Sequence, residues 1–197
     1  LVLLIELDLS DNLLTDLAPL GSLPRLEILK VGWNAPTSLD ALMELSGLRI
    51  LDMSSCGIHD LSALQSLDAL ASLTASWNRI SDLSPLSGHQ DLRVLDVSVN
   101  EMRDLSPLSG LAQLSYLNVG WNDVRDLSAL ADCHGLTILL ASGSSVQDAC
   151  GLAALSRLQW VDLSDNDLRA VPTFGDDVSL VHLNLRDNRI PDLAPLG

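Results

Sequence analysis

The sequence is poor in aromatic residues and in basic ones. Aromatic side chains make up 3% of its 197 residues, and 11 Lys and Arg stand against 26 Asp and Glu, for a net charge of −15. Nucleic-acid binding requires a basic stripe that neutralises phosphates, and a chain of this charge is poorly suited to provide one. An anionic membrane surface would repel the same charge. We therefore expect neither nucleic acid nor a membrane surface as a partner.

The sequence also lacks long apolar runs and paired cysteines. None of its apolar runs is long enough to insert into a membrane, and no secretory signal is present among the 197 residues. The three cysteines, Cys56, Cys133 and Cys150, occupy unrelated positions in an odd number. No Cys and His spacing is typical of a metal site, so we expect no metal and no cofactor. Free buried thiols are the expected state, and they favour a reducing, cytoplasmic location.

The abundant feature is leucine at one fixed period. Residues 92–108 read LRVLDVSVNEMRDLSPL, and the same pattern recurs every 22 residues. It predicts a short strand over residues 94–97, a turn at Asn100 and a tight helical return that opens at Asp104. The units begin at Leu4, Leu26, Leu48, Leu70, Leu92, Leu114, Leu136, Leu158 and Leu180. Nine units in one register predict a repeat protein in which each coil contacts only its neighbours.

The shared template, LxxLxLxxNxIxDLxPL, resembles the leucine-rich repeat family in its 22-residue, internalin-like form. Regulatory subunits of protein phosphatases carry a similar short repeat. The resemblance covers nearly the whole chain and implies an α/β solenoid, a right-handed horseshoe or arc of about nine coils. A parallel β-sheet would line the concave face, and short 3-10 or irregular turns the convex face. The internalins imply a bacterial surface adhesin, whereas the phosphatase regulators imply an intracellular adaptor.

The whole of 1–197 is expected to form a single leucine-rich repeat solenoid domain. Neither end shows the polar closing element that a terminal coil needs, so we expect the chain to be a segment of a longer protein without its caps.

Two polar columns are explained by the fold itself. An amide both donates and accepts, so an inward Asn can satisfy backbone groups of its own coil and the next one. This Asn column contains Asn12, Asn34, Asn78, Asn100, Asn122, Asn166 and Asn188. An Asp before the DL step can cap the first amides of the return. This Asp column contains Asp16, Asp60, Asp82, Asp104, Asp126, Asp148 and Asp192.

The residues that flank the inner leucines are expected to face out on the concave side, because side chains alternate across a strand. From the fifth unit to the eighth these outward positions are apolar: Val94, Val99, Tyr116, Trp121, Ile138, Leu140 and Trp160. Acids surround them, among them Asp96, Asp162 and Asp165. An apolar centre with an acidic rim predicts a protein partner with a hydrophobic anchor and basic flanks, and no small-molecule substrate.

Three tryptophans form a second pattern. Trp33, Trp77 and Trp121 recur every 44 residues, so every second coil carries one. One explanation is ancestral duplication of a two-coil unit, with each ring lying across the neighbouring loop. The other is a binding role, since exposed Trp is a favoured anchor at interfaces. The sequence is compatible with both.

Residues with catalytic or metal-binding chemistry are present but isolated. His182 could lie near Ser164 and Asp162, yet nothing supplies an oxyanion hole or an enclosing pocket, so we expect no enzyme. Asp165, Asp167 and Asp187, on adjacent coils, could share a calcium ion, but plain surface acids are the simpler explanation. The expected function is a protein-binding module that uses its concave face. The alternative is an architectural segment built into a large assembly.

The Asn column generates the first testable prediction. Replacing Asn100 by Ala leaves buried backbone groups of adjacent coils without partners, so the free energy of unfolding should fall by about 1–3 kcal/mol. Equilibrium denaturation in urea measures this directly. An unchanged free energy of unfolding would show that the column does not join the coils.

Overall fold

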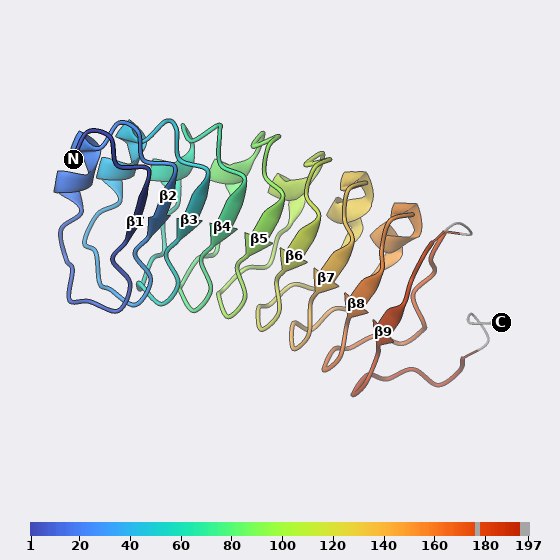
Figure 1. Ribbon diagram of the computed structural model, residues 1–197. Helices are drawn as coiled ribbons and strands as arrows, with labels where there is room; N and C mark the ends of the chain where they lie inside the picture. The colour runs from blue at the N-terminus through green and yellow to red at the C-terminus, as the bar shows by residue number, and fades with distance from the viewer. Residues whose placement is uncertain (176–177, 194–197) are drawn as a thin grey trace.

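The computed structural model describes residues 1–175 and 178–193, and they form an elongated arc of stacked coils (Figure 1). Each coil contributes one three-residue strand to a single nine-stranded sheet. The strands are β1 (Glu6–Asp8), β2 (Ile28–Lys30), β3 (Ile50–Asp52), β4 (Ser72–Thr74), β5 (Val94–Asp96), β6 (Tyr116–Asn118), β7 (Ile138–Leu140), β8 (Trp160–Asp162) and β9 (His182–Asn184). The solenoid predicted from the 22-residue period is confirmed.

All strands are parallel, and each pairs with the next in chain order. The register is constant: Val94 lies opposite Tyr116, and Tyr116 opposite Ile138. Equivalent positions of successive units are therefore direct neighbours across the sheet. This register converts every sequence column into a row of side chains.

Seven of the returns contain a short 3-10 helix. These are η1 (Ala18–Ser22), η2 (Asp40–Glu44), η3 (Ser62–Leu64), η4 (Ser84–Leu86), η5 (Ser106–Leu108), η6 (Ser128–Asp132) and η7 (Cys150–Ala154). The described part of the return between β8 and β9 contains none, which agrees with its different sequence, LRAVPTF.

The Asp column opens these helices as predicted. The Asp104 carboxylate accepts a hydrogen bond from the Ser106 amide at 2.8 Å, and five other members of the column make the equivalent bond. Hydrogen bonds from the Ser106 amide and hydroxyl lower the pKa of Asp104. For Asp192 the equivalent amide, at residue 194, lies outside the described residues.

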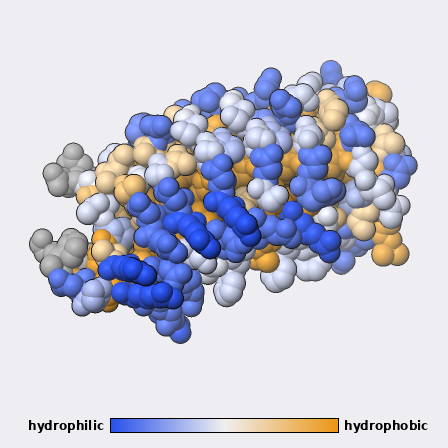
Figure 2. Space-filling view, turned by 180° about the vertical axis from the view of Figure 1, so that it is seen from behind, coloured by the Kyte–Doolittle hydropathy of each residue, from blue (hydrophilic) through white to orange (hydrophobic). Residues whose placement is uncertain are grey.

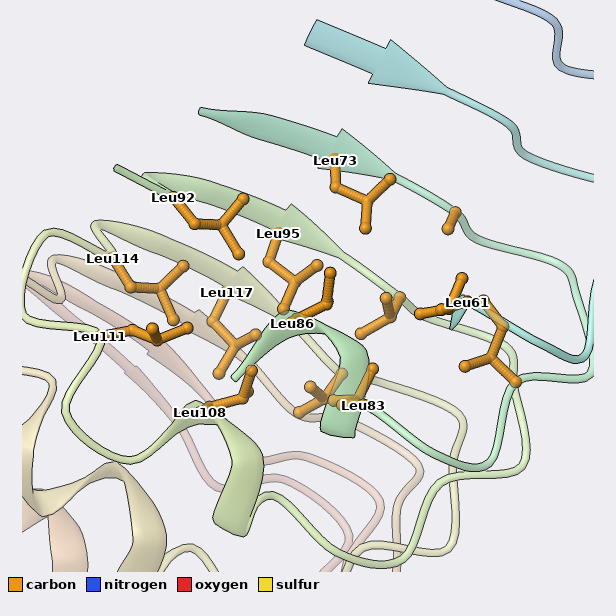
Figure 3. Close-up of a cluster of buried hydrophobic side chains, with 14 of the residues drawn as sticks. Leu61, Leu73, Leu83, Leu86, Leu92, Leu95, Leu108, Leu111, Leu114 and Leu117 are labelled. Carbon is orange, nitrogen blue, oxygen red and sulfur yellow. The ribbon is translucent and has the colours of Figure 1, made fainter. Parts of the chain in front are cut away.

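Leucine fills the interior of every coil. Side chains from the strands and from the returns point toward one another, as Leu95, Leu117, Leu86 and Leu108 do in Figure 3. These residues are fully buried, and they belong to one continuous core cluster that begins at Leu17. Each buried leucine contributes about 1.5–3 kcal/mol relative to exposure, which makes this core the main stabilising element.

The first coil is less buried than the inner coils. Leu1 is exposed, whereas its equivalents Leu23 and Leu45 lie in the core, and Leu3 and Leu13 are also exposed. Figure 2 shows orange, apolar atoms at the end opposite the grey residues, and bands of hydrophilic side chains along the length of this face. An inner coil is covered by a neighbour on both sides, whereas only one described coil lies against the first.

The Asn column joins coils, but in a different direction from the one predicted. The side chain of Asn34 donates to the carbonyl of Leu9 at 2.9 Å and accepts from the amide of Leu14 at 2.9 Å, both in the preceding coil. A further bond goes to Val31 in its own coil. The prediction that the amide reaches the next coil is wrong. Asn12 is exposed because no described coil precedes it.

Cys56 occupies the Asn position of the third coil, and its neighbour explains why a thiol suffices. Its Sγ atom donates to the Val31 carbonyl at 3.2 Å, as an Asn would. A thiol accepts hydrogen bonds only weakly, and Cys56 makes no bond like the one that Asn78 accepts from the amide of Ile58. The residue that would donate it, two positions after Asn34, is Pro36, which has no N–H. The two unusual residues therefore compensate for each other.

The expectation of three buried thiols is correct for two cysteines and wrong for the third. Cys56 and Cys133 are buried, but Cys150 is exposed at the start of η7. Burial raises the pKa of the Cys133 thiol to about 11. The neighbouring Asp148 carboxylate, which accepts a hydrogen bond from the Cys150 thiol, raises the pKa of Cys150.

The pairing of Pro36 with Cys56 predicts coupled stability effects. Cys56→Asn alone buries an amide oxygen that lacks the donor two positions after Asn34, and Pro36→Val alone creates an N–H that faces only a thiol, a weak acceptor. Each should lower the free energy of unfolding by about 1–3 kcal/mol. The double variant should recover at least about 1 kcal/mol of the summed loss, measured by urea denaturation of all four proteins. Strictly additive losses would contradict the pairing.

The burial of the cysteines predicts their reactivity. A disulfide reagent added to the native protein should modify one thiol, that of Cys150, and all three in denaturant. The modification rate of Cys150 should keep rising with pH above the ordinary thiol pKa of about 8.5, because its carboxylate neighbour holds the proton. A Cys150→Ser variant is the control and should show no fast thiol. Rapid native labelling of Cys133 would refute this assignment.

Candidate partner-binding surface

Four outward side chains form a continuous apolar row across the sheet. The strand register places Val94, Tyr116, Ile138 and Trp160 directly beside one another, on β5 to β8. We call these four residues the apolar strand row. Trp160 is 45% exposed, and the other three are partly exposed. The predicted adjacency of these residues is confirmed, and burial alternates along each strand with the middle residue inward.

The next row toward the ends of the strands is mostly polar, and its acids have structural roles. Asp96 accepts hydrogen bonds from the amide and hydroxyl of Ser98 at 3.0 and 2.7 Å. Asp162 binds Ser164 in the same way. These carboxylates stabilise the turns after β5 and β8, and they border the apolar strand row. Leu140 stands in this row between Asn118 and Asp162 and extends the apolar surface.

Burial and charge both act on Tyr116 within the apolar strand row. Desolvation raises the pKa of its phenol, and the nearby Asp96 carboxylate adds to the rise. The ring therefore stays neutral at physiological pH, with a hydroxyl group that can hydrogen-bond at one end. An aromatic side chain with a polar tip suits a protein interface.

Trp160 has a partner that sequence reasoning assigned to other chemistry. The His182 ring stacks on Trp160 with ring centroids 3.7 Å apart and an interplanar angle of 15°. The Ser164 hydroxyl donates to Asp162 at 2.7 Å. His182 forms no hydrogen bond with Ser164 among the described residues, so these three side chains are not arranged as a catalytic triad. The sequence did contain a signal for this stack, because Trp160 and His182 occupy the same column and are therefore neighbours across the sheet.

A third row follows the strands in an unusual backbone conformation. Trp33, Val99, Trp121 and Asp165 lie three positions beyond the ends of their strands, in turns and not on the strands themselves. Their φ angles are 59°, 55°, 57° and 54°, and all other members of this column also have positive φ. This left-handed region costs an ordinary residue about 1–2 kcal/mol, and a β-branched or bulky residue is rare there.

The three tryptophans of this row are its most exposed large side chains. Trp33 and Trp77 are 64% exposed, and Trp121 is 62% exposed. We call these three residues the tryptophan row. The Trp121 ring lies over the next coil, where a Cβ atom on Gly143 would approach its Cδ2 atom to 3.0 Å. The predicted contact of a ring with the neighbouring loop is thus present at Trp121, although most of the ring surface faces solvent.

A shallow hollow of about 330 Å³ lies beyond Trp121. Its lining consists of Trp121, Gly143, Ser145, Asp165, Asn166 and Asp167. The Trp121 ring supplies an apolar wall, and the two aspartates supply negative charge. Sequence reasoning missed this hollow, although Gly143 in a column that otherwise carries side chains was an available signal.

Two of the three acids considered as calcium ligands pair with arginines. Asp167 pairs with Arg189 at 2.9 Å, and Asp187 pairs with Arg186 at 2.8 Å. No group of three or more metal-ligating side chains occurs within residues 1–175 and 178–193. In the same part of the chain no helix is long and apolar enough to cross a membrane.

Comparison with known proteins identifies the type of repeat. A family model described as Leucine Rich repeat matches residues 47–64. Internalin C2 of Listeria monocytogenes is 31% identical with a TM-score of 0.87, over 90% of this chain and 79% of that chain. An internalin of the same organism, inlF, is 30% identical with a TM-score of 0.77, over 98% of this chain and 64% of that chain.

More distant proteins share the fold alone. The ectodomain of an Arabidopsis thaliana membrane receptor kinase, in complex with Casparian strip integrity factor 2, is 23% identical with a TM-score of 0.80. The match covers 94% of this chain and 24% of the receptor. A sequence search of curated proteins found no match. The chain thus spans most of one internalin, but less than two thirds of the other.

Proposed function

This chain belongs to the leucine-rich repeat family, and we propose that it binds a partner protein on the concave, strand-lined face of its arc. The partner would contact the apolar strand row and Leu140. Asp96, Asp162 and Asp165 would border the contact, and no chemical step would take place.

The observation that carries this proposal is the apolar strand row itself. Four neighbouring outward positions, on β5 to β8, are occupied by Val94, Tyr116, Ile138 and Trp160. The core lies on the other side of each strand, so packing does not require apolar side chains here. A continuous exposed apolar patch of this kind marks an interaction site in soluble proteins. Its two aromatic side chains are of the type that dominates binding energy at interfaces.

The charges beside the row indicate the partner's chemistry. Carboxylates cap the strand-end turns beside the row, and the chain as a whole carries a net charge of −15. A partner with an apolar or aromatic anchor and flanking Lys or Arg would match the apolar centre and the acidic border. The plant receptor of the same fold is in complex with another factor, which supports a binding role only by analogy.

A displayed library of random peptides would test the proposal. Peptides enriched on the wild-type chain should carry an aromatic or aliphatic anchor and basic residues. Their affinity for Trp160→Ala and Tyr116→Ala should fall by about 2 kcal/mol or more, which is about thirtyfold, measured by calorimetry. The thermal midpoint of each variant should stay close to that of the wild type.

Met43→Ala is the matched control. Met43 is as exposed as Trp160, at 45%, but it lies in η2 and not in the sheet. Its removal should leave peptide affinity unchanged. Normal binding by both aromatic variants, together with melting several degrees lower, would show that the rings are packing residues. Loss of binding with Met43→Ala alone would favour the architectural alternative, in which contacts lie off the concave face.

A further inference from the structure

We propose that the tryptophan row binds a proline-rich segment in the left-handed polyproline II conformation, with a basic residue of that segment in the hollow beyond Trp121. The inference goes beyond the proposed function, because the tryptophan row lies in the turns and not on the strands. Either proposal can fail without the other.

The first argument is that the fold gains little from these tryptophans. Each indole occupies a position with φ of 57–59°, which Asp, Ser, Val or Gly occupies in the other coils. Each is also 62–64% exposed, so little of its surface is removed from water. Three strained positions that carry the largest apolar side chain at high exposure indicate a ligand rather than packing.

The second argument is the spacing of the rings. The Trp33 amide donates to Ser54 at 2.8 Å, and the Ser55 amide donates to Ser76 at 2.9 Å, so the hydrogen-bond ladder of the sheet continues through this column. The ladder holds neighbouring coils about 4.8 Å apart, which places equivalent atoms of alternate coils about 9.6 Å apart. The row therefore repeats at about 9.6 Å from Trp33 to Trp77 and again to Trp121.

Among regular peptide conformations, polyproline II fits this repeat best. It has three residues per turn and a rise of about 3.1 Å, so every third residue returns to the same side after about 9.3 Å. A β-strand returns to the same side after about 6.8 Å, which is out of step with the row. An α-helix returns after seven residues and about 10.5 Å, and the error accumulates over two intervals.

The chemistry of the row also suits such a segment. Prolines present flat apolar rings to aromatic side chains, and polyproline II leaves its backbone carbonyls free. None of the three indole N–H groups donates a hydrogen bond to another described residue, so each can donate to a ligand carbonyl.

The hollow gives the segment a charged end. Its apolar lining is the Trp121 ring, and Asp165 and Asp167 also line it. Asp167 already pairs with Arg189, whereas Asp165 is exposed. A guanidinium or ammonium group placed here would stack on the indole and approach a carboxylate. The expected ligand is thus a run of prolines followed or preceded by Arg or Lys.

The probes are two synthetic peptides, nine prolines with two arginines at either the N-terminal or the C-terminal end. A peptide with two arginines and nine Gly and Ser residues is the control for charge. Calorimetry on the wild-type chain should show at least tenfold tighter binding of one proline peptide than of the control. Equal binding of all three peptides would overturn the proposal, because charge alone would then account for the affinity.

Variants then locate the site. Trp77→Asn removes the middle ring and keeps a residue that tolerates positive φ, so the fold should be retained, as circular dichroism would check. It should weaken the proline peptide at least tenfold, whereas Trp160→Ala, outside the row, should have no effect. Asp165→Asn should weaken binding of the proline peptide that carries arginines, but it should not change binding of a peptide of nine prolines alone. The opposite pattern, loss with Trp160→Ala and none with Trp77→Asn, would overturn this inference and favour the strand face.

Discussion

Everything in this protein depends on the hydrogen bonds that join one coil to the next. A three-residue strand has no stability alone, and a coil buries its leucines only when a neighbour covers it. The strand ladder and the inward amides, such as that of Asn34, satisfy the backbone groups that this stacking buries. Where Cys56 replaces the amide, one residue that would have donated to it is Pro36, which has no N–H to leave unpaired.

The constant register of these bonds determines what the surface can display. Each outward sequence column becomes a row of side chains about 4.8 Å apart, so a substitution in one coil changes one position in that row. Most residues in these rows have structural roles: Asp104 caps the start of a return, and Asp96 stabilises a turn. Departures from the template are therefore informative. Leu140 in a polar row and Trp77 in a left-handed turn add nothing that stacking requires.

The two candidate surfaces lie side by side and differ in character. The residues of the apolar strand row lie on adjacent parallel strands of the sheet, and Trp160 stacks on His182. The tryptophan row lies in the turns beyond the strand ends, with one exposed ring on every second coil. The acids that the fold uses for turns give both surfaces a negative surround. The acids that shape the turns are therefore the residues that the proposed basic partner would meet.

The sequence alone determined the period, the sheet, the leucine core and the two polar columns, because each depends on local pattern repeated nine times. It also placed Tyr116, Ile138 and Trp160 in one row, since a fixed period with parallel pairing has one possible register. The tertiary structure decided what local pattern does not contain. The Asn side chains bind the preceding coil because its carbonyl and amide groups, such as those of Leu9 and Leu14, point toward them. The left-handed turn at Trp33 was hidden because Trp rarely adopts that conformation, and the ladder to the next coil imposes it. Cys150 is exposed, and Trp121 covers Gly143, because these positions depend on how one coil lies against another in space.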